Sequence, residues 1–311
     1  GVAVGEAGGI PPLHALIADL FRPSERGRAF AIVQIGGPLG VLAAFFAGGI
    51  LAAAFDWRTV FYVTGGVGVL FALVLWRYLP EPRRGRAVPV RGSVGVLAAT
   101  RRLLAVPAYR HLLAGIGWAG FGLYATIIWA PSFLIRSFGL PISQVGLVLG
   151  IAFGVLGAVA VLAVGPLADA RKRRDRGAYA AIPGVMVPLA VAGFLSGSLM
   201  GAMLLLLLPI MMMSAWQPPI IAAVQDVATA ETRALASAVS MLTLNLLGLG
   251  LGPLVVGMVS DALAPSLGAE SLRHALLTVP AAFAVAGIHW IVAARRLRAP
   301  AASPGRTEMA G

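Results

Sequence analysis

Long apolar runs separated by short polar connections dominate the sequence. Nine of these runs approach or exceed the roughly 20 residues that a membrane-spanning helix needs. They cover residues 1–21, 29–54, 59–79, 111–135, 143–168, 178–198, 200–224, 235–258 and 274–294. The runs are too long for strands and lack an alternation of period two, and their many glycines and prolines are typical of membrane helices. The pattern therefore predicts an all-α integral membrane protein.

Composition supports the same conclusion, because 59% of the 311 residues are hydrophobic and only 12% are charged. Soluble domains carry about 25% charged residues. The net charge of +12 does not indicate nucleic-acid binding, since the basic residues fall in clusters between the apolar runs. The chain has no cysteine, and its four histidines are scattered without metal-binding spacing. We therefore expect no metal and no cofactor.

The distribution of basic residues predicts an orientation. Of the 24 lysines and arginines, all but Arg58, Arg136 and Arg273 fall in alternate connections. The side rich in positive charge is expected to be cytoplasmic. This places the C-terminus inside the cell, in a multi-pass protein of the inner (plasma) membrane.

The longest polar break, 80–110, divides the chain into parts. We predict the last three spans of an N-terminal bundle over 1–79, a cytoplasmic loop over 80–110, a six-span C-terminal bundle over 111–294 and a cytoplasmic tail over 295–311.

An internal repeat relates the two parts. Residues 11–33 and 218–240 align when shifted by 207 positions. The matching pairs are Pro11/Pro218, Pro12/Pro219, Ala15/Ala222, Asp19/Asp226, Arg26/Arg233, Ala29/Ala236 and Ala31/Ala238. Both copies run from outside to inside, six spans apart. Such a parallel repeat implies two six-helix bundles related by an axis along the membrane normal. We therefore expect twelve spans, three of which would precede Gly1.

Several segments resemble known transporters. The sequence GPLADARKRR at 165–174 is similar to a cytoplasmic loop motif of the major facilitator superfamily, with Gly165, Asp169, Arg173 and Arg174 matching. The segments WAPSFLIRSFGLPISQVG at 129–146 and NLLGLGLGPLVVGMVSD at 245–261 resemble its spinster-like branch. The resemblance implies a major facilitator fold of two pseudo-symmetric bundles, with nine of twelve helices in this chain. It also implies a monomer.

Charged residues near the cytoplasmic ends of spans are candidates for a gate. Gly165 permits close helix approach, and Asp169 can pair with arginine or lie at a helix N-terminus. Asp19 and Asp226, each seven residues before Arg26 and Arg233, are predicted to hold the gate closed by pairing with basic residues such as Arg173. The alternative is a set of ordinary helix-end charges, each worth about 0–1 kcal/mol when exposed.

Glu6 and His14 are the candidates for proton coupling. An ionisable residue inside a spanning run is costly and commonly serves in a proton relay. The alternatives are a Glu6 that caps a helix or meets lipid headgroups, and a His14 that only packs.

The substrate cavity is predicted from five side chains on the seventh and tenth spans of the inferred full protein. They are Trp118, Tyr124, Trp129, Trp216 and Gln217. The resemblance implies that these spans line the cavity, although aromatic residues in spans often pack or anchor instead. Gln34 and Asn245 are polar but lie on spans that more often pack around it.

These features predict a secondary transporter rather than an enzyme. The chain has no Walker A run and no set of nucleophile, base and orienting acid. We expect alternating-access transport of a small organic or amphipathic substrate, such as a lysolipid or an organic anion, coupled to protons. Membrane lipids are expected partners and nucleic acid is not. The alternative is a non-transporting membrane sensor or structural partner with the same fold.

Overall fold

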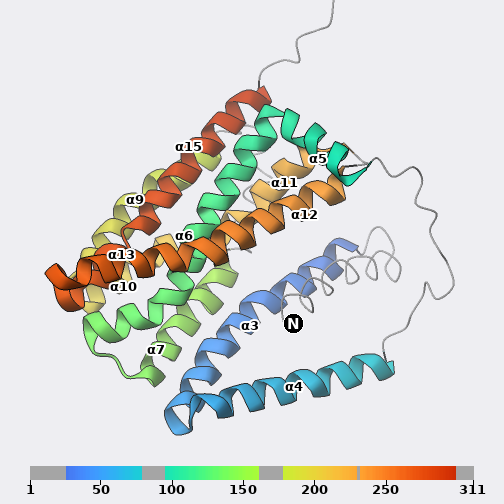
Figure 1. Cartoon of the computed structure of the whole chain (residues 1–311). Helices are drawn as coiled ribbons and strands as arrows, with labels where there is room; N and C mark the ends of the chain where they lie inside the picture. Colours follow the sequence, from blue (N-terminus) through green and yellow to red (C-terminus); the bar gives the residue numbers. More distant parts are fainter. Residues whose placement is uncertain (1–25, 79–94, 161–177, 230–231, 299–311) are drawn as a thin grey trace, which may run out of the picture. The chain divides into compact units, whose positions relative to one another are not determined.

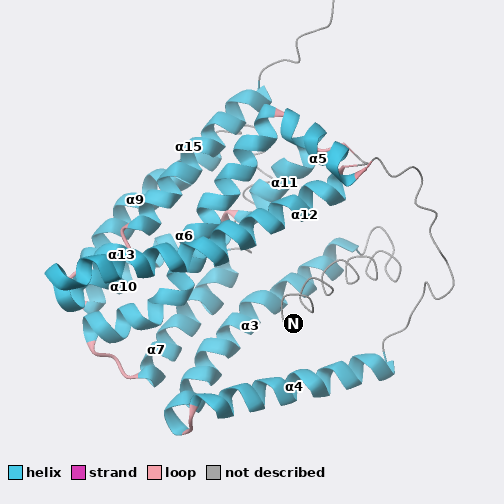
Figure 2. Ribbon diagram, viewed as in Figure 1, coloured by secondary structure: helices cyan, strands magenta, loops and turns pink. Residues whose placement is uncertain are grey.

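The computed structural model describes residues 26–78, 95–160, 178–229 and 232–298. Every element assigned within these ranges is helical, as the ribbon shows (Figure 2). This confirms the predicted all-α class. Within the described residues, the predicted spans from 29–54 onward are mostly helical, and the first run, 1–21, lies outside these residues.

The chain forms two compact units, the first from residues 1–93 and 141–158. Its described elements are α3 (Arg26–Ala54), α4 (Trp57–Tyr78), α7 (Ile142–Leu149) and the π-helical turn η1 (Gly150–Leu156). Small residues hold α7 and η1 against α3, because a Cβ atom at Gly49 would lie 2.9 Å from the Gly146 Cα. Leu42 lies against Gly154 in the same way. Close approach at glycine is a main source of helix association in lipid.

Residues 141–158 thus pack with α3, although the sequence-based division places them in the C-terminal bundle. The physical reason is the glycine seam, which lets α7 and η1 approach α3 backbone to backbone. The division into two six-helix bundles stays a prediction.

Asp56 fixes the corner between α3 and α4. Its carboxylate accepts hydrogen bonds from the Thr59 N–H at 2.9 Å and from the Thr59 hydroxyl at 3.1 Å. An aspartate in this place satisfies a free N–H group at a helix start. The guanidinium of Arg58 lies over the Trp57 ring, 4.4 Å from its centroid.

The second unit comprises residues 94–140 and 159–311. Its elements are α5 (Val96–Ala105), α6 (Pro107–Phe138), α9 (Ala178–Leu195), α10 (Leu199–Ala215), α11 (Gln217–Val227), α12 (Arg233–Thr243), η2 (Leu244–Leu251), α13 (Gly252–Leu267), η3 (Gly268–Glu270), α14 (Ser271–Ala275) and α15 (Thr278–Arg298). Helix α6 packs against α15, η2 and α13, and α15 also contacts α9 (Figure 1).

Local sequence sets the ends of these helices. Helix α6 begins with Pro107, whose missing N–H costs nothing at a first position, and it ends at Gly139 with φ of 67°. Pro218 and Pro219 explain why one predicted span becomes two helices, because they cannot donate to the carbonyls of the preceding turn. Helix α10 accordingly ends at Ala215, and α11 begins at Gln217.

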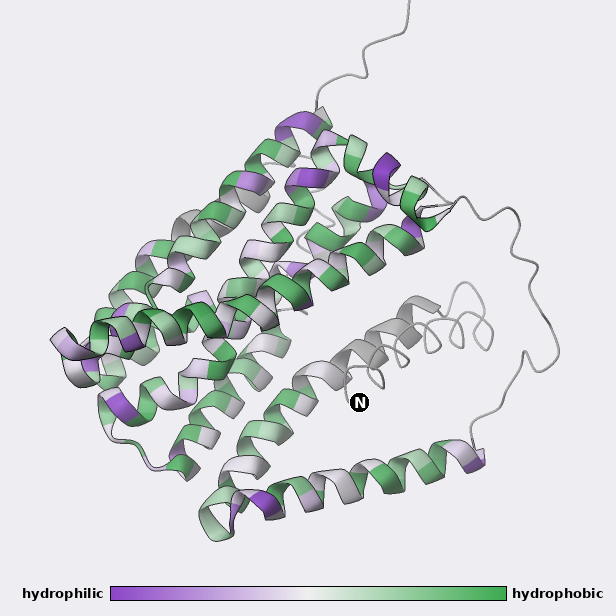
Figure 3. Ribbon diagram, viewed as in Figure 1, coloured by the Kyte–Doolittle hydropathy of each residue, from purple (hydrophilic) through white to green (hydrophobic). Residues whose placement is uncertain are grey.

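Four stretches of the described helix are long and apolar enough to cross a membrane. They are Trp57–Tyr78, Pro107–Phe138, Ile142–Ala160 and Leu235–Leu297. The last contains a reversal at Gly268, where φ is 54°. Within the second unit, hydrophilic residues gather near helix ends while the middles are mostly apolar (Figure 3). This is the pattern expected of a multi-pass membrane protein.

Candidate functional site

Tyr124 on α6 and Asn245 on η2 form a polar pair between two apolar helices. The Tyr124 hydroxyl donates a hydrogen bond to Asn245 Oδ1 at 3.3 Å. The tyrosine ring lies against Gly248, where an added Cβ would be 2.8 Å from the ring carbon Cδ2. Tyr124 is half-buried and Asn245 is exposed. The missing side chain at Gly248 therefore lets the ring lie on η2 and reach the amide.

The sequence-based prediction selected Tyr124 for the cavity but assigned Asn245 to a packing span. The structure brings the two together. Asn245 lies in a π-helical segment, where bonds run from i to i+5, and such segments occur frequently at functional sites. The sequence does contain a signal for Asn245, because it is a polar residue inside the apolar run LNLLGLGL.

Trp129 joins α6 to α13. Its indole N–H donates to the Pro253 carbonyl at 2.9 Å, and its ring faces Gly257, where an added Cβ would lie 3.1 Å away. The single N–H group of Trp129 is therefore engaged in helix packing. Tyr124 and Trp129 thus both face the continuous run of η2 and α13.

The other predicted cavity residues have different neighbours. Trp216 lies at the break between α10 and α11, is only 1% exposed, and contacts Trp290 with ring centroids 5.4 Å apart. Gln217 follows it and is half-buried. Trp118 is 42% exposed, with its ring centroid 6.1 Å from that of Phe121. Their role in a cavity stays a prediction.

The described gate candidates flank one connection. Asp226 lies in the last turn of α11, Arg233 is the first residue of α12, and both are exposed. The helix dipole favours negative charge at the N-terminus and positive charge at the C-terminus. Asp226 and Arg233 have the opposite placement, so the dipole disfavours both. These charges are therefore not placed to stabilise their own helices.

The repeat is visible in this geometry. Arg26 lies in α3, whose description begins at this residue, and Arg233 is the first residue of α12, so both repeat copies carry their arginine in a helix. The Gln225 amide donates to the Ser237 hydroxyl at 2.6 Å and ties α11 to α12 across the connection. The remaining gate and coupling candidates lie outside the described residues: Glu6, His14, Asp19, Gly165, Asp169, Arg173 and Arg174. The side chain of Arg26 is also outside them.

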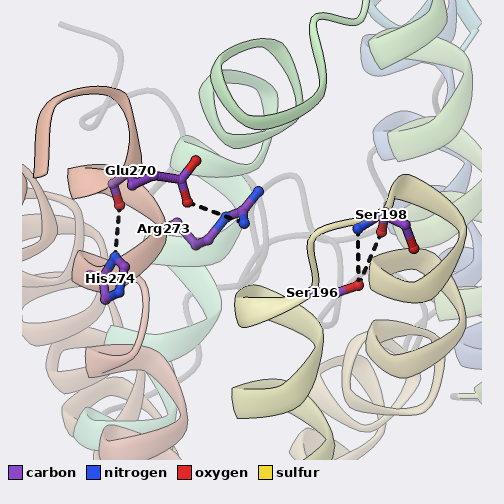
Figure 4. A network of polar contacts seen from close by, with 5 residues as sticks. All are labelled: Ser196, Ser198, Glu270, Arg273 and His274. Atoms are coloured by element: carbon purple, nitrogen blue, oxygen red, sulfur yellow. Dashed lines mark hydrogen bonds and ion pairs between the residues drawn. The ribbon is translucent and has the colours of Figure 1, made fainter.

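A second group of polar contacts lies at the C-terminal end of α6, near Phe138. Arg273 is buried and pairs with Glu270, with Nη1 and Oε2 3.1 Å apart, while its guanidinium lies 5.5 Å from the centroid of Phe138. Figure 4 shows Glu270, Arg273 and His274 on one short stretch, with Ser196 and Ser198 on a neighbouring connection. Ser198 caps α10 by accepting from the Gly201 N–H at 3.1 Å. The hydrogen bonds and the ion pair of this group each join residues at most four positions apart, so they fix the local conformation of two connections.

The described residues contain no group of three or more histidine, aspartate or glutamate side chains that could hold a metal ion. The candidate site consists of the polar pair Tyr124 and Asn245 within the helices and of the charged residues Asp226 and Arg233, which flank the connection between α11 and α12.

Comparison with known proteins identifies the class. Residues 2–253 match the sequence profile of the Major Facilitator Superfamily, and the chain belongs to this superfamily of transporters. It is 34% identical over 306 residues to an MFS-type efflux pump of Mycolicibacterium smegmatis, covering 96% of this chain and 70% of the pump.

Two further relatives match shorter regions. Protein spinster homolog 1 of Mus musculus is 33% identical over 142 residues, which is 44% of this chain and 27% of that protein. The 3-(3-hydroxy-phenyl)propionate transporter of Escherichia coli K12 is 31% identical over 177 residues, 54% of this chain and 40% of that transporter. The chain therefore spans less than half the length of both.

A solved structure has the same fold. It is the crystal structure of a bacterial homolog of the human lysosomal transporter Spinster, in an inward-facing and unoccupied conformation. The TM-score is 0.80 at 24% sequence identity, covering 95% of this chain and 76% of that one. The predicted major facilitator fold and the resemblance to the spinster-like branch are confirmed, and the family assigns this chain to transport rather than catalysis.

Proposed function

We propose that the protein is a proton-coupled secondary transporter for a small organic or amphipathic anion. It works by alternating access in the inner (plasma) membrane, as a monomer, with its C-terminus in the cytoplasm. Family membership supports transport. The names of its relatives support the substrate class, since one is an efflux pump and another a transporter of an aromatic carboxylate. The distribution of basic residues supports the orientation.

The observation that carries the proposal is the polar pair of Tyr124 and Asn245. Polar groups inside a spanning region are costly and commonly mark a substrate or ion pathway. Because Asn245 Oδ1 accepts from Tyr124, the amide is oriented and its Nδ2 group keeps two N–H donors. Such donors suit a carboxylate or phosphate oxygen. The apolar surfaces of the helices around the pair suit the hydrocarbon part of an amphipathic anion.

Reconstitution in liposomes tests the function. We would load a pH-sensitive dye, offer 3-arylpropionates and then lysophosphatidic acid to the purified full-length protein, and follow internal pH and substrate uptake together. Substrate flux accompanied by proton movement is the expected result. Binding of a substrate without any flux, in liposomes of either orientation, would instead support the sensor alternative.

Loss of the Tyr124–Asn245 bond is expected to weaken substrate binding. Tyr124→Phe and Asn245→Ala should each raise the KM about 5- to 10-fold, since one hydrogen bond contributes about 1–1.5 kcal/mol. Because the two residues act as a pair, the KM of the double variant should rise by less than the product of the two single increases. Initial rates of uptake against substrate concentration measure this.

Thr243→Val is a suitable control, because the Thr243 hydroxyl bonds to the Val239 carbonyl within its own helix at 2.9 Å. An unchanged KM in Tyr124→Phe and Asn245→Ala would remove the pair from the substrate site.

Neutralising the gate is expected to change the rate of transport rather than substrate affinity. We propose that Asp226 pairs with Arg173 in the closed inner gate. Asp226→Asn should lower the maximal uptake rate about 3- to 10-fold, the equivalent of about 0.7–1.4 kcal/mol. The exchange Asp226→Arg with Arg173→Asp should restore a large part of the loss.

The control for this gate is Asp261→Asn, which removes an exposed acid from α13. If the exchanged pair is as slow as the single variants, the proposed gate pairing is wrong.

A further inference from the structure

Two histidines outside the proposed site face each other between α6 and α15. The Nδ1 atoms of His111 and His289 lie 3.0 Å apart, and their ring centroids are 5.3 Å apart with an interplanar angle of 37°. Both side chains are half-buried. The residues are 178 positions apart in the chain, and only the packing of α6 against α15 brings them together.

The chemistry of imidazole limits the states in which this contact exists. A neutral ring has one N–H donor and one acceptor nitrogen, whereas a protonated ring has two donors. The bond between the two Nδ1 atoms therefore forms when the pair carries no proton or one proton beyond the neutral state. A second proton removes the acceptor and places two positive rings at the same short distance.

The contact lies in a close helix seam. The Trp290 indole lies against Gly115, at a distance that leaves no room for a side chain there, and Phe283 fills the space over Gly122. These contacts follow a spacing of seven residues on both helices, so α6 and α15 pack as antiparallel neighbours along this seam. A change at the histidine pair acts directly on the end of that seam.

Positive charges surround the pair. Arg110 on α6 and Arg296 on α15 interact electrostatically with His111. The other described ionisable side chains near this end, on α6, on α15 or on elements packed against them, are Arg101, Arg102, Tyr109, Asp226, Arg233 and Arg295. Tyr109 is itself engaged, because its hydroxyl donates to the Ala236 carbonyl at 3.2 Å.

We propose that His111 and His289 form a proton-binding pair that joins α6 to α15 while at most one ring is charged, and that releases this end of the seam when both are charged. We expect the pair to respond to cytoplasmic pH. This part of the inference rests on the proposed function, which places this end of the seam in the cytoplasm. The pair itself does not depend on that function. It gives acidification a direct effect on the packing of the second unit.

Histidine-selective NMR tests the pair directly, because the chain has only four histidines. In protein labelled with ¹⁵N at histidine, the signals of His111 and His289 should shift together in two coupled steps as pH falls. In His289→Asn, the remaining His111 should titrate in one step. Independent single-step titration of both rings in the unmodified protein would overturn the proposal.

Thermal unfolding in detergent gives a second readout. At pH 8 the midpoint of His111→Ala should lie about 2–4 °C below that of the unmodified protein. As pH falls to 5, the midpoint of the unmodified protein should approach that of His111→Ala. His274→Asn is the matched control, since His274 Nδ1 faces the Glu270 carbonyl at 3.0 Å and has no part in the pair.

Parallel pH profiles for the unmodified protein and His111→Ala would count against the pair. Neither measurement involves substrate. A failure of the transport assay therefore leaves this inference standing, and a failure here leaves the proposed transport function untouched.

Discussion

Replacing Gly252 by alanine is expected to lower the thermal unfolding midpoint by about 5 °C, which corresponds to about 1–3 kcal/mol of overpacking. A Cβ atom at this position would lie 2.5 Å from the Phe121 carbonyl oxygen and 3.2 Å from its Cα. Both are backbone atoms of α6, so no side chain can rotate away. The helices α6 and α13 would have to separate along the seam that carries Tyr124 and Trp129.

Gly250 supplies the matched control within the same run. Its added Cβ would meet only the Asn245 carbonyl oxygen, at 3.9 Å. Gly250→Ala should therefore leave the midpoint unchanged or raise it slightly, because alanine favours helix over glycine. Midpoints measured by tryptophan fluorescence in the same detergent compare the two. Equal losses in both variants would show that the close approach of α6 and α13 is not the cause.

Replacing Glu6 by glutamine is expected to reduce substrate-driven proton movement about 100-fold. Glutamine keeps the size and polarity of the side chain but cannot take up and release a proton at physiological pH. A carboxyl group in an apolar run is costly and is accounted for most simply by a role in coupling. Exchange of substrate down its own gradient should persist, since this process does not require net proton transfer.

The assay compares internal pH with counterflow of labelled substrate in the same liposomes. Glu81→Gln, in the predicted loop 80–110, removes a carboxylate outside the spans and should leave both signals unchanged. If proton movement in Glu6→Gln equals that of the unmodified protein, Glu6 is not the carrier, and His14→Gln becomes the next variant to measure.

Much of the fold follows from local sequence rules. Apolar run length predicted the helices, because backbone groups in lipid must bond within their own segment. Pro107 and Gly139 set the ends of α6, and Pro218 with Pro219 set the break after Ala215. These features depend on neighbouring residues alone, so the sequence carries them directly.

The length of helices was harder to predict than their existence. Helix α6 extends to Phe138 and the run from α12 to α13 extends to Leu267, both beyond the predicted spans. Apolar composition marks the part of a helix that lies in lipid, whereas capping residues decide where the backbone bonds end. A helix can therefore continue past its apolar segment.

The membrane class, the helical runs and the repeat can be read from the order of residues alone, because each rests on composition or on contacts within one segment. Only the tertiary structure paired Tyr124 with Asn245 and His111 with His289, which are 121 and 178 positions apart. Such pairs depend on the rotation of each helix about its axis and on which glycines permit close approach. Those quantities follow from the fit between whole helix surfaces, and no single segment contains them.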